Sequence, residues 1–320
     1  MPSTQLPITT AGPLRFHLQH QWARLPADLK WGNTHGLAQD KAGHLYVAHT
    51  VHADSRVRDA VVVLDPQGNF VRSFGAAYDG SAHGLELFEE DGTEYLYLTD
   101  LKQGLFKLTL QGEVVWHFAK PEMYRRLFGL KWCPTNVAAA PGGDLYLADG
   151  YGTGFIIRID RHGNEMDFFG GPGKHADAVT HPHGLFMDTR GAEPVLLVAE
   201  NLPTQVRTFS LDGTPLKAQL TDDGTLEAPR HFTQMGEYLI VPDLAGRVAV
   251  LDAQNALVGY LGDAGVPLND LFPIRGNPSE SFTDGQFVHP HDVLVRPDGS
   301  LLVAEWVEHG RLTLLTPAPN

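Results

Sequence analysis

The segment FVHPHDVLVRPDGSLLVAEW, which runs from Phe287 to Trp306, sets two histidines around a proline directly before a strand-like pattern. Apolar and polar residues alternate from Val293, a PDG turn follows at 297–299, and a second apolar run ends in Glu305. Alternation with period two on both sides of a Gly-bearing turn predicts an antiparallel β-hairpin. One hairpin fits many folds, so the fold depends on whether this unit recurs.

The unit occurs six times along the chain. The copies are THGLAQDKAGHLYVAHT from Thr34, AHGLELFEEDGTEYLYLTD from Ala82, PTNVAAAPGGDLYLADGYGTG from Pro134, HPHGLFMDTRGAEPVLLVAEN from His181, PRHFTQMGEYLIVPDLAGR from Pro229 and HPHDVLVRPDGSLLVAEW from His289. Most copies continue into a second hairpin, as in AVVVLDPQGNFVRSFG from Ala60. Four strands in a unit of roughly 40–50 residues are typical of a propeller blade.

We therefore predict an all-β protein, a six-bladed β-propeller of four-stranded antiparallel blades in a single domain, 1–320. The blades are expected to start near residues 35, 83, 136, 183, 231 and 291. The last copy lacks a fourth strand, and LRFHLQHQWARL, at about 14–25, has an alternating pattern without another partner. We expect this strand to complete the last blade and close the ring, which removes exposed sheet edges. A short helix is expected only in the loop at 121–132.

Composition narrows the range of partners. The formal net charge is −14, which opposes binding to a phosphate backbone, so nucleic acid is not an expected partner and a small-molecule substrate is. No apolar stretch is long enough to cross a membrane, and the single cysteine, Cys133, has no partner for an intrachain disulfide. The first residues lack the basic start and apolar core of a secretory signal, so we expect a cytoplasmic protein. The oligomeric state is left open.

Histidine recurs at one position of the repeat, the start of the first strand. The six residues there are His35, His83, Asn136, His183, His231 and His291. The whole chain has 16 histidines in 320 residues, so five in six positions is far above background. In a propeller the first strand of each blade lines the axis, so these side chains should face one another. A structural histidine copied by duplication is the alternative, but neighbouring positions have diverged freely.

A ring of imidazoles predicts a metal site, because neutral imidazole is the commonest protein ligand for metals. Three of the histidines are two blades apart each time and make the expected ligand set: His83, His183 and His291. His35 and His231 are two further candidate ligands, or groups that orient substrate or act as acid and base. Imidazole suits zinc, iron, copper or nickel, so the sequence does not select the metal.

Two more residues are candidates for catalysis. Tyr151 lies in a Gly-rich turn, LADGYGTG, from which its ring can lean over the channel, and near a metal its phenol can ionise and act as a base. Asp292 follows His291 directly and is expected either to hydrogen-bond a ligand imidazole or to cap the strand.

These motifs resemble those of peptidyl-α-hydroxyglycine α-amidating lyase, a six-bladed propeller related to the NHL-repeat proteins. Its patterns PHGL, PTDVAV…SDGYCNSRI, PHSL…VADREN and MPHDIV correspond here to AHGL, PTNVAA…ADGYGTGFI, PHGL…VAENLP and HPHDVL. The resemblance implies zinc ligands at His83, His183 and His291 and a catalytic Tyr151, and Asp292 matches the aspartate after the last ligand.

The chain departs from that family where substrate is recognised. Thr50 and Asn201 replace two family arginines, and neither offers the fork of donors that fits a carboxylate. Arg56, Arg58 and Arg230 are the candidates to supply charge from other positions, and the expected substrate pocket contains Asn136, Asn201, Arg230 and Trp306. Peptide amidation itself is therefore not expected.

The sequence thus favours a metal-dependent lyase, most readily with zinc, that cleaves C–N or C–O at a hydroxylated carbon. A lactonase- or esterase-type hydrolase and an oxygen-dependent enzyme with iron or copper remain alternatives. A non-enzymatic NHL-type binding scaffold is a fourth reading, although it gives the histidines no role.

Overall fold

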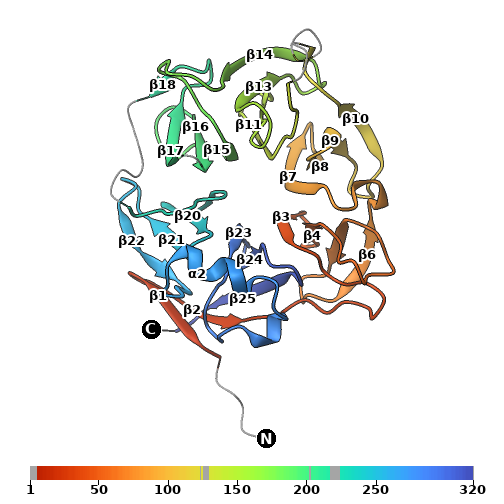
Figure 1. Cartoon of the computed structure of the whole chain (residues 1–320), viewed down its shortest axis with the longest axis vertical. Helices are drawn as coiled ribbons and strands as arrows, with labels where there is room; N and C mark the ends of the chain where they lie inside the picture. The colour runs from red at the N-terminus through yellow and green to blue at the C-terminus, as the bar shows by residue number, and fades with distance from the viewer. Residues whose placement is uncertain (1–5, 123, 125–129, 202, 217–223, 320) are drawn as a thin grey trace, which may run out of the picture.

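Six antiparallel sheets are arranged around a common axis, with each inner strand nearest the centre of the ring (Figure 1). This computed structural model describes residues 6–122, 124, 130–201, 203–216 and 224–319. The arrangement confirms the predicted six-bladed β-propeller with antiparallel blades.

Each blade is a meander from the axis outward. Blade 1 contains β3 (Thr34–Gln39), β4 (Leu45–His49), β5 (Val61–Leu64) and β6 (Phe70–Phe74). Blade 2 contains β7 (Ala82–Glu90), β8 (Thr93–Asp100), β9 (Gly104–Leu108) and β10 (Val114–Phe118). Blade 3 contains β11 (Asn136–Ala139), β12 (Leu145–Ala148), β13 (Phe155–Ile159) and β14 (Glu165–Gly170). Blade 4 contains β15 (Pro182–Asp188), β16 (Val195–Asn201), β17 (Thr204–Phe209) and β18 (Pro215–Leu216). Blade 5 contains β19 (Thr233–Met235), β20 (Tyr238–Asp243), β21 (Arg247–Leu251) and β22 (Leu257–Leu261).

The two ends of the chain meet in blade 6. This sheet has the order β1-β2-β25-β24-β23, in which β23 (Pro290–Val295), β24 (Leu301–Glu305) and β25 (Arg311–Pro317) come from the C-terminal end. The N-terminal strand β2 (Leu14–Gln19) is antiparallel to β25, with Leu18 opposite Leu315. It ends six residues before the expected limit of 25, and β1 (Ile8–Ala11) adds a fifth strand that the sequence did not predict.

The core lies between the blades rather than at the axis. Among the described residues, each of the six blade–blade interfaces contains one cluster of buried apolar side chains, and a smaller seventh cluster contains Leu271, Val288 and Val307. Between blades 1 and 2, for example, Tyr46 and Val61 pack with Leu85 and Leu96. Because these layers hold neighbouring inner strands together, the side chains that point to the axis are free to carry polar groups.

Helices are few among the described residues. A single α-helical turn, α2 (Leu268–Leu271), lies in the long loop before β23, with the 3-10 turns η2 (Phe272–Ile274) and η3 (Ser279–Ser281). The helix expected within 121–132 falls partly on residues 123 and 125–129, which lie outside the described residues. In the part of the chain that the structure describes, we find no helix long and apolar enough to cross a membrane.

Candidate metal centre

Four imidazoles converge at the axis. The ring centroids of His35 and His83 are 4.7 Å apart, those of His83 and His183 are 5.0 Å apart, those of His183 and His291 are 4.9 Å apart, and those of His291 and His35 are 4.7 Å apart. The diagonal from His83 to His291 is also short, at 5.0 Å. One ring nitrogen each from His35, His83 and His291 lies within 4.8 Å of the others. All four side chains are buried, with 2–6% of their surface exposed.

A β-bulge turns each of these histidines toward the axis. Between β23 and β24 the register shifts at His291, because Pro290 is opposite Glu305 and Asp292 is opposite Ala304. The same irregularity occurs at the histidine of β3, β7 and β15. By contrast, Asn136 of β11 is in regular register with Ala148. A bulge re-aims one side chain without ending the strand, which is why such features are common next to active sites.

Backbone carbonyls of the next blade fix two of the imidazoles. The Nδ1–H of His83 donates to the carbonyl oxygen of Thr135 over 2.8 Å, and the Nδ1–H of His183 donates to that of Arg230 over 2.9 Å. Since a carbonyl can only accept, Nδ1 carries the proton and Nε2 keeps its lone pair. This is the arrangement by which proteins orient metal-binding histidines.

The glycine after each of these histidines makes the carbonyl contact possible. A Cβ on Gly184 would lie 2.1 Å from the carbonyl oxygen of Arg230, and one on Gly84 would lie 2.7 Å from that of Thr135. Any larger residue would push the neighbouring blade away. The sequence motif HG, which marks three of the six copies, therefore has a physical reason that the pattern alone did not reveal.

The four imidazoles at the axis are in the neutral form that metal binding requires. Burial lowers the pKa of His83 to about 4, and it also lowers the pKa values of His35, His183 and His291 well below 6.5, with the neighbouring imidazoles and Arg230 adding to the effect. The four rings are therefore neutral at pH 7 and retain free lone pairs. Nδ1 of His35 and Nε2 of His183 are buried and have no hydrogen-bond partner, which is unusual for polar atoms in a protein interior.

The space between the rings suits one ion. The cavity has a volume of about 10 Å³, roughly that of a single water molecule. Imidazole nitrogens bind zinc at about 2.0–2.1 Å, so two ligands on opposite sides of one ion are up to about 4.2 Å apart. Nitrogens within 4.8 Å of one another need only small side-chain movements to reach that range. The residues present thus fit a bound metal ion, and a substrate has to approach from the mouth.

The fifth ring histidine has a different role. Nδ1 of His231 lies 2.7 Å from Oδ1 of Asp292, and Nε2 lies 3.0 Å from Oε1 of Glu86. Burial disfavours its charged form, but the two carboxylates outweigh burial and hold the pKa of His231 well above 6.5. With both nitrogens engaged, His231 is neither a fourth ligand nor a free acid–base group in this arrangement, in contrast to our expectation.

Asp292 is part of the same structural cluster. Its Oδ1 accepts from His231 and from the backbone N–H of Val293, and its Oδ2 accepts from the backbone N–H of Leu37 in blade 1. It therefore supports the strands that carry His291 and His35 and makes no hydrogen bond to a ligand imidazole. Of the two roles expected for it, the structure favours the capping one.

Asn136 lines the small cavity and also links neighbouring blades. Its Oδ1 accepts from the backbone N–H of Leu185, and its Nδ2 donates to Glu86. These hydrogen bonds join blades 3, 4 and 2, and a contact between Asn136 and substrate stays a prediction. The sequence did not single out Glu86, and its only signal there is a charged residue between the apolar Leu85 and Leu87.

Tyr151 and Arg230 lie beside the imidazoles, on the side of the mouth. The Tyr151 ring centroid is 5.5 Å from that of His83 and 5.5 Å from that of His183. Burial raises the pKa of Tyr151, and the positive charge of Arg230 only partly opposes this, so the phenol is protonated near pH 7. Nε and Nη1 of Arg230 are buried without a hydrogen-bond partner.

The rim of the mouth is aromatic. Trp306 follows the end of β24, and the guanidinium of Arg275 lies 3.6 Å from the centre of its ring. The rings of His289 and Phe272 are 5.7 Å and 6.4 Å from that of Trp306. Asn201 ends β16, and its Oδ1 is buried without a partner. Neither Trp306 nor Asn201 lines the small cavity between the imidazoles, so any contact with substrate would be made outside it.

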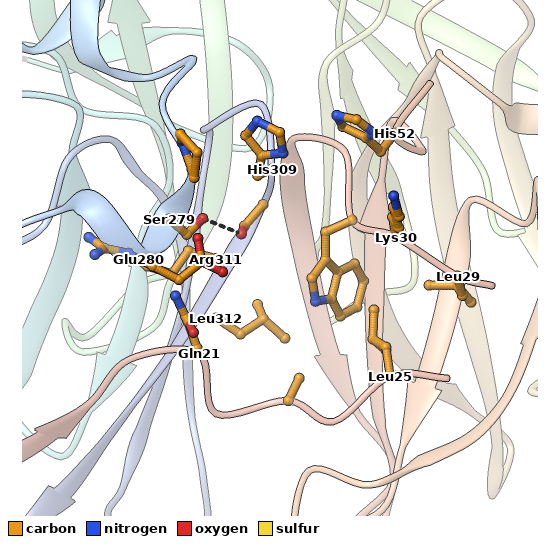
Figure 2. Close-up of a pocket in the computed structure, with 14 residues that line it drawn as sticks. Gln21, Leu25, Leu29, Lys30, His52, Ser279, Glu280, His309, Arg311 and Leu312 are labelled. Atoms are coloured by element: carbon orange, nitrogen blue, oxygen red, sulfur yellow. Dashed lines mark hydrogen bonds between the residues drawn. The ribbon is translucent and has the colours of Figure 1, made fainter. Parts of the chain in front are cut away.

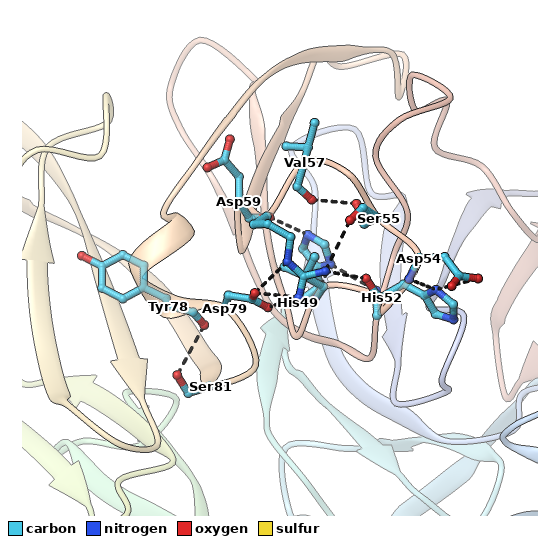
Figure 3. A network of polar contacts seen from close by, with 12 residues as sticks. His49, His52, Asp54, Ser55, Val57, Asp59, Tyr78, Asp79 and Ser81 are labelled. Carbon is cyan, nitrogen blue, oxygen red and sulfur yellow. Dashed lines mark hydrogen bonds and ion pairs between the residues drawn. The ribbon is translucent and has the colours of Figure 1, made fainter.

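The acidic residues that end the second strand of five blades are structural. Asp149 accepts from the backbone N–H groups of Cys133 and Thr153, and Asp243 accepts from those of Glu227 and Ala228. Both tie the incoming loop to the blade. In blade 1 this position is His49, whose Nδ1 accepts from Gly32 and Val51 and whose Nε2 meets the carbonyl of Asp59 (Figure 3).

Two arginines near this network do not supply a free charge to the site. Arg58 forms a double hydrogen bond with Asp79, which Figure 3 shows beside His49. Arg56 lies on the exposed surface. Thr50, where the related family has an arginine, accepts hydrogen bonds from Asn33 through its hydroxyl.

A larger hollow of about 400 Å³ lies between blades 6 and 1, away from the histidine ring. Figure 2 shows Leu25, Leu29 and Leu312 on its apolar side, with His52 and His309 at one end. Among the described residues, only the ring gathers three or more potential metal ligands. The small cavity between the imidazoles is therefore the candidate site, although the hollow between blades 6 and 1 has the larger volume.

The chain is similar to two curated proteins at low identity. The chain is 25% identical over 331 residues to peptidyl-α-hydroxyglycine α-amidating lyase 1 of Drosophila melanogaster, covering 90% of this chain and 57% of that protein. It is 23% identical over 310 residues to a probable peptidyl-α-hydroxyglycine α-amidating lyase of Caenorhabditis elegans, covering 86% and 80%. The chain thus spans little more than half the length of the fly relative. The resemblance inferred from the motifs is confirmed as a distant one.

Solved structures support the fold. A streptogramin B lyase has a TM-score of 0.62 at 13% identity, over 95% of this chain and 98% of that one. A virginiamycin B lyase from Staphylococcus aureus has a TM-score of 0.58 at 12% identity, over 95% and 100%. No protein-family model matches the chain.

Proposed function

We propose that this chain is a metal-dependent lyase that cleaves a C–N or C–O bond at a carbon bearing a hydroxyl group. The observation that carries the proposal is the set of neutral, bulge-directed imidazoles around a cavity of one-ion size. The names of the two distant relatives, both amidating lyases, support the class of reaction. His83, His183 and His291 would hold the metal. Zinc is the first candidate, because the motifs around these three residues resemble those of the amidating-lyase family.

The reaction needs only proton movements and one bond cleavage. The hydroxyl group loses its proton, its oxygen forms a C=O bond, and the C–N or C–O bond breaks with the electron pair on the leaving atom, which then takes a proton. No oxidant or water is consumed. When bound, the metal supplies a Lewis acid that lowers the pKa of the substrate hydroxyl.

We assign Tyr151 as the proton donor to the leaving atom. Its ring is equally close to two ligand imidazoles, and burial keeps its phenol protonated at neutral pH. A protonated phenol can donate to a departing nitrogen or oxygen. This role differs from the base suggested by the sequence, because burial raises its pKa in the absence of a metal ion.

Arg230 indicates that the substrate is an anion. A buried guanidinium without a carboxylate partner is costly, and an anionic substrate group would satisfy it. Arg230 comes from a different blade position than the two arginines expected from the amidating lyases, where this chain has Thr50 and Asn201. We therefore propose a hydroxylated carboxylate substrate and not the peptide substrate named for the relatives.

A second candidate function is supported by the fourth imidazole. Four neutral nitrogens suit iron or copper as well as zinc, and such a centre could activate oxygen. The two functions differ in their co-substrate, because only the second consumes oxygen.

The test uses the purified protein after chelation and after reloading with zinc, iron, cobalt or copper. It is incubated with 2-acylamino-2-hydroxy carboxylates and 2-alkoxy-2-hydroxy carboxylates, and release of the carbonyl product is followed by NMR, with an oxygen electrode in parallel. Metal-dependent carbonyl release without oxygen uptake is the expected result. Carbonyl release from none of these substrates with any metal would contradict the lyase proposal. Oxygen uptake would favour the second candidate.

A further inference from the structure

His35 lies close to the other imidazoles, although it is not one of the three histidines that the family resemblance implies as ligands. Its centroid is 4.7 Å from both His83 and His291, whereas His183 is 5.0 Å and 4.9 Å from the same two rings. The tightest group of ligand atoms in the described chain is His35, His83 and His291. By these distances His35 belongs to the ring at least as closely as His183 does.

Of the two ring nitrogens of His35, Nδ1 has no hydrogen-bond partner, while the backbone of Asn33 interacts with the ring and opposes the lowering of its pKa by burial. At the equivalent position of blade 3, both ends of the Asn136 amide are hydrogen-bonded, and in blade 5 both nitrogens of His231 meet carboxylates. In His35, Nδ1 is buried and unpaired. Buried polar atoms are nearly always satisfied, so an unpaired imidazole nitrogen in this position points to a missing partner.

The backbone around His35 is shaped as it is around the other three. The register of β3 against β4 shifts between Thr34 and Leu37, at the histidine. Gly36 lets blade 2 approach, because a Cβ there would lie 2.3 Å from the backbone nitrogen of Leu85. Asp292 accepts from the backbone N–H of Leu37 over 2.8 Å, which joins the strand of His35 to that of His291.

We infer that His35 is a fourth nitrogen ligand of the metal ion held by His83, His183 and His291. This inference rests on the proposed function for the existence of that ion and goes beyond it in the ligand set. No described carboxylate is free to join the set, since Asp292 and Glu86 are bound to His231.

A fourth protein ligand leaves fewer coordination positions on the metal ion for the substrate hydroxyl. A catalytic zinc site keeps three protein ligands and one open position. Four protein nitrogens fill a tetrahedral ion, so the substrate hydroxyl would bind as a fifth ligand. Zinc can expand to five ligands, and an octahedral ion such as ferrous iron would keep two positions open.

The test is a titration of the metal-free protein with Co²⁺ alone, followed by visible absorption. His35→Asn is compared with His83→Asn, and asparagine is chosen because Asn136 already occupies the equivalent position in blade 3. His289→Asn is the matched control, since Nε2 of His289 is also buried and unpaired but lies outside the ring. Thermal unfolding of each variant reports folding, and His35→Gln replaces a variant that fails to fold.

We expect His35→Asn to weaken Co²⁺ binding by more than the roughly 10- to 100-fold that loss of an outer partner of a ligand costs. Its remaining complex should have a changed ligand-field spectrum, as for His83→Asn, whereas His289→Asn should match the wild type. Wild-type affinity and spectrum in His35→Asn, together with loss of binding in His83→Asn, would overturn the fourth ligand and leave the proposed function standing. Absence of Co²⁺ binding to the wild type would overturn both.

Discussion

Replacing Gly184 by alanine should disable the metal site without touching a ligand. The new Cβ would lie 2.1 Å from the carbonyl oxygen of Arg230, and the other atoms nearest to it are also backbone, at 3.0 Å. Real Cβ atoms do not approach closer than about 3.0 Å, so blade 5 must move by about 0.9 Å. That movement would lengthen the 2.9 Å hydrogen bond from His183 to as much as about 3.8 Å, which is no longer a hydrogen bond.

The consequence for binding can be estimated from the role of that hydrogen bond. It fixes the tautomer and orientation of the His183 imidazole, and loss of such a partner typically lowers metal affinity by roughly 10- to 100-fold. Overpacking should also lower the free energy of unfolding by about 1–3 kcal/mol. Both quantities can be measured on one preparation, by Co²⁺ titration and by denaturant unfolding of the metal-free protein.

Gly142→Ala is the matched control. Gly142 lies in an exposed turn of blade 3, and a Cβ there would meet nothing within 4 Å. We expect its affinity for Co²⁺ to equal that of the wild type. Unchanged affinity in Gly184→Ala, or equal weakening in Gly142→Ala, would refute the idea that the glycine serves the ligand through the carbonyl.

Three further predictions test the surroundings of the ring. Tyr151→Phe should keep the metal content of the wild type but lower turnover of an active substrate by roughly 10²- to 10⁴-fold, as expected for loss of a proton donor; equal turnover would exclude that role. Arg230→Met should weaken binding of lactate measured by calorimetry, because it removes the guanidinium whose buried Nε and Nη1 have no partner; unchanged lactate binding would contradict the anion site. His49→Asp should reduce the loss of stability between pH 7 and pH 5 by about 2 kcal/mol in urea unfolding; an unchanged loss would show that His49 does not titrate as described.

The sign of the last prediction follows from the pKa of His49. Burial lowers it from 6.5 to about 3, so below pH 6.5 the unfolded chain binds a proton that the folded chain does not. Stability therefore falls as the pH drops from about 6.5 toward 3. Aspartate is the natural replacement, because blades 2, 3 and 5 already carry one at this position, and in blades 3 and 5 its oxygens accept from backbone N–H groups of the incoming loop.

The sequence was sufficient for the blades because each hairpin is specified locally. Alternation and Gly-bearing turns occur within a few residues, so the six copies could be recognised without knowledge of their contacts. β1 was not predicted, since Ile8–Ala11 is short and becomes a strand only by pairing with β2 at the outer edge of blade 6. Strands that depend on a distant edge leave little local signal.

The histidine positions could be predicted, but their roles could not. Spacing alone placed all five near the axis. What separates His231 from His35 is a pair of carboxylates, of which Asp292 is 61 residues away in sequence. Likewise, the bulges that aim four of the histidines at the axis arise from pairing between strands and have no sequence pattern of their own. Long-range partners decide which imidazoles are free.

The most direct test of the central claim is elemental analysis by mass spectrometry of the protein as purified, beside His83→Asn and His291→Asn. The histidine ring predicts close to one transition-metal ion per chain in the wild type and almost none in either variant, with both variants folded by circular dichroism. A wild type without metal even after reconstitution, or variants that retain the full amount, would contradict a metal centre at the axis of this propeller.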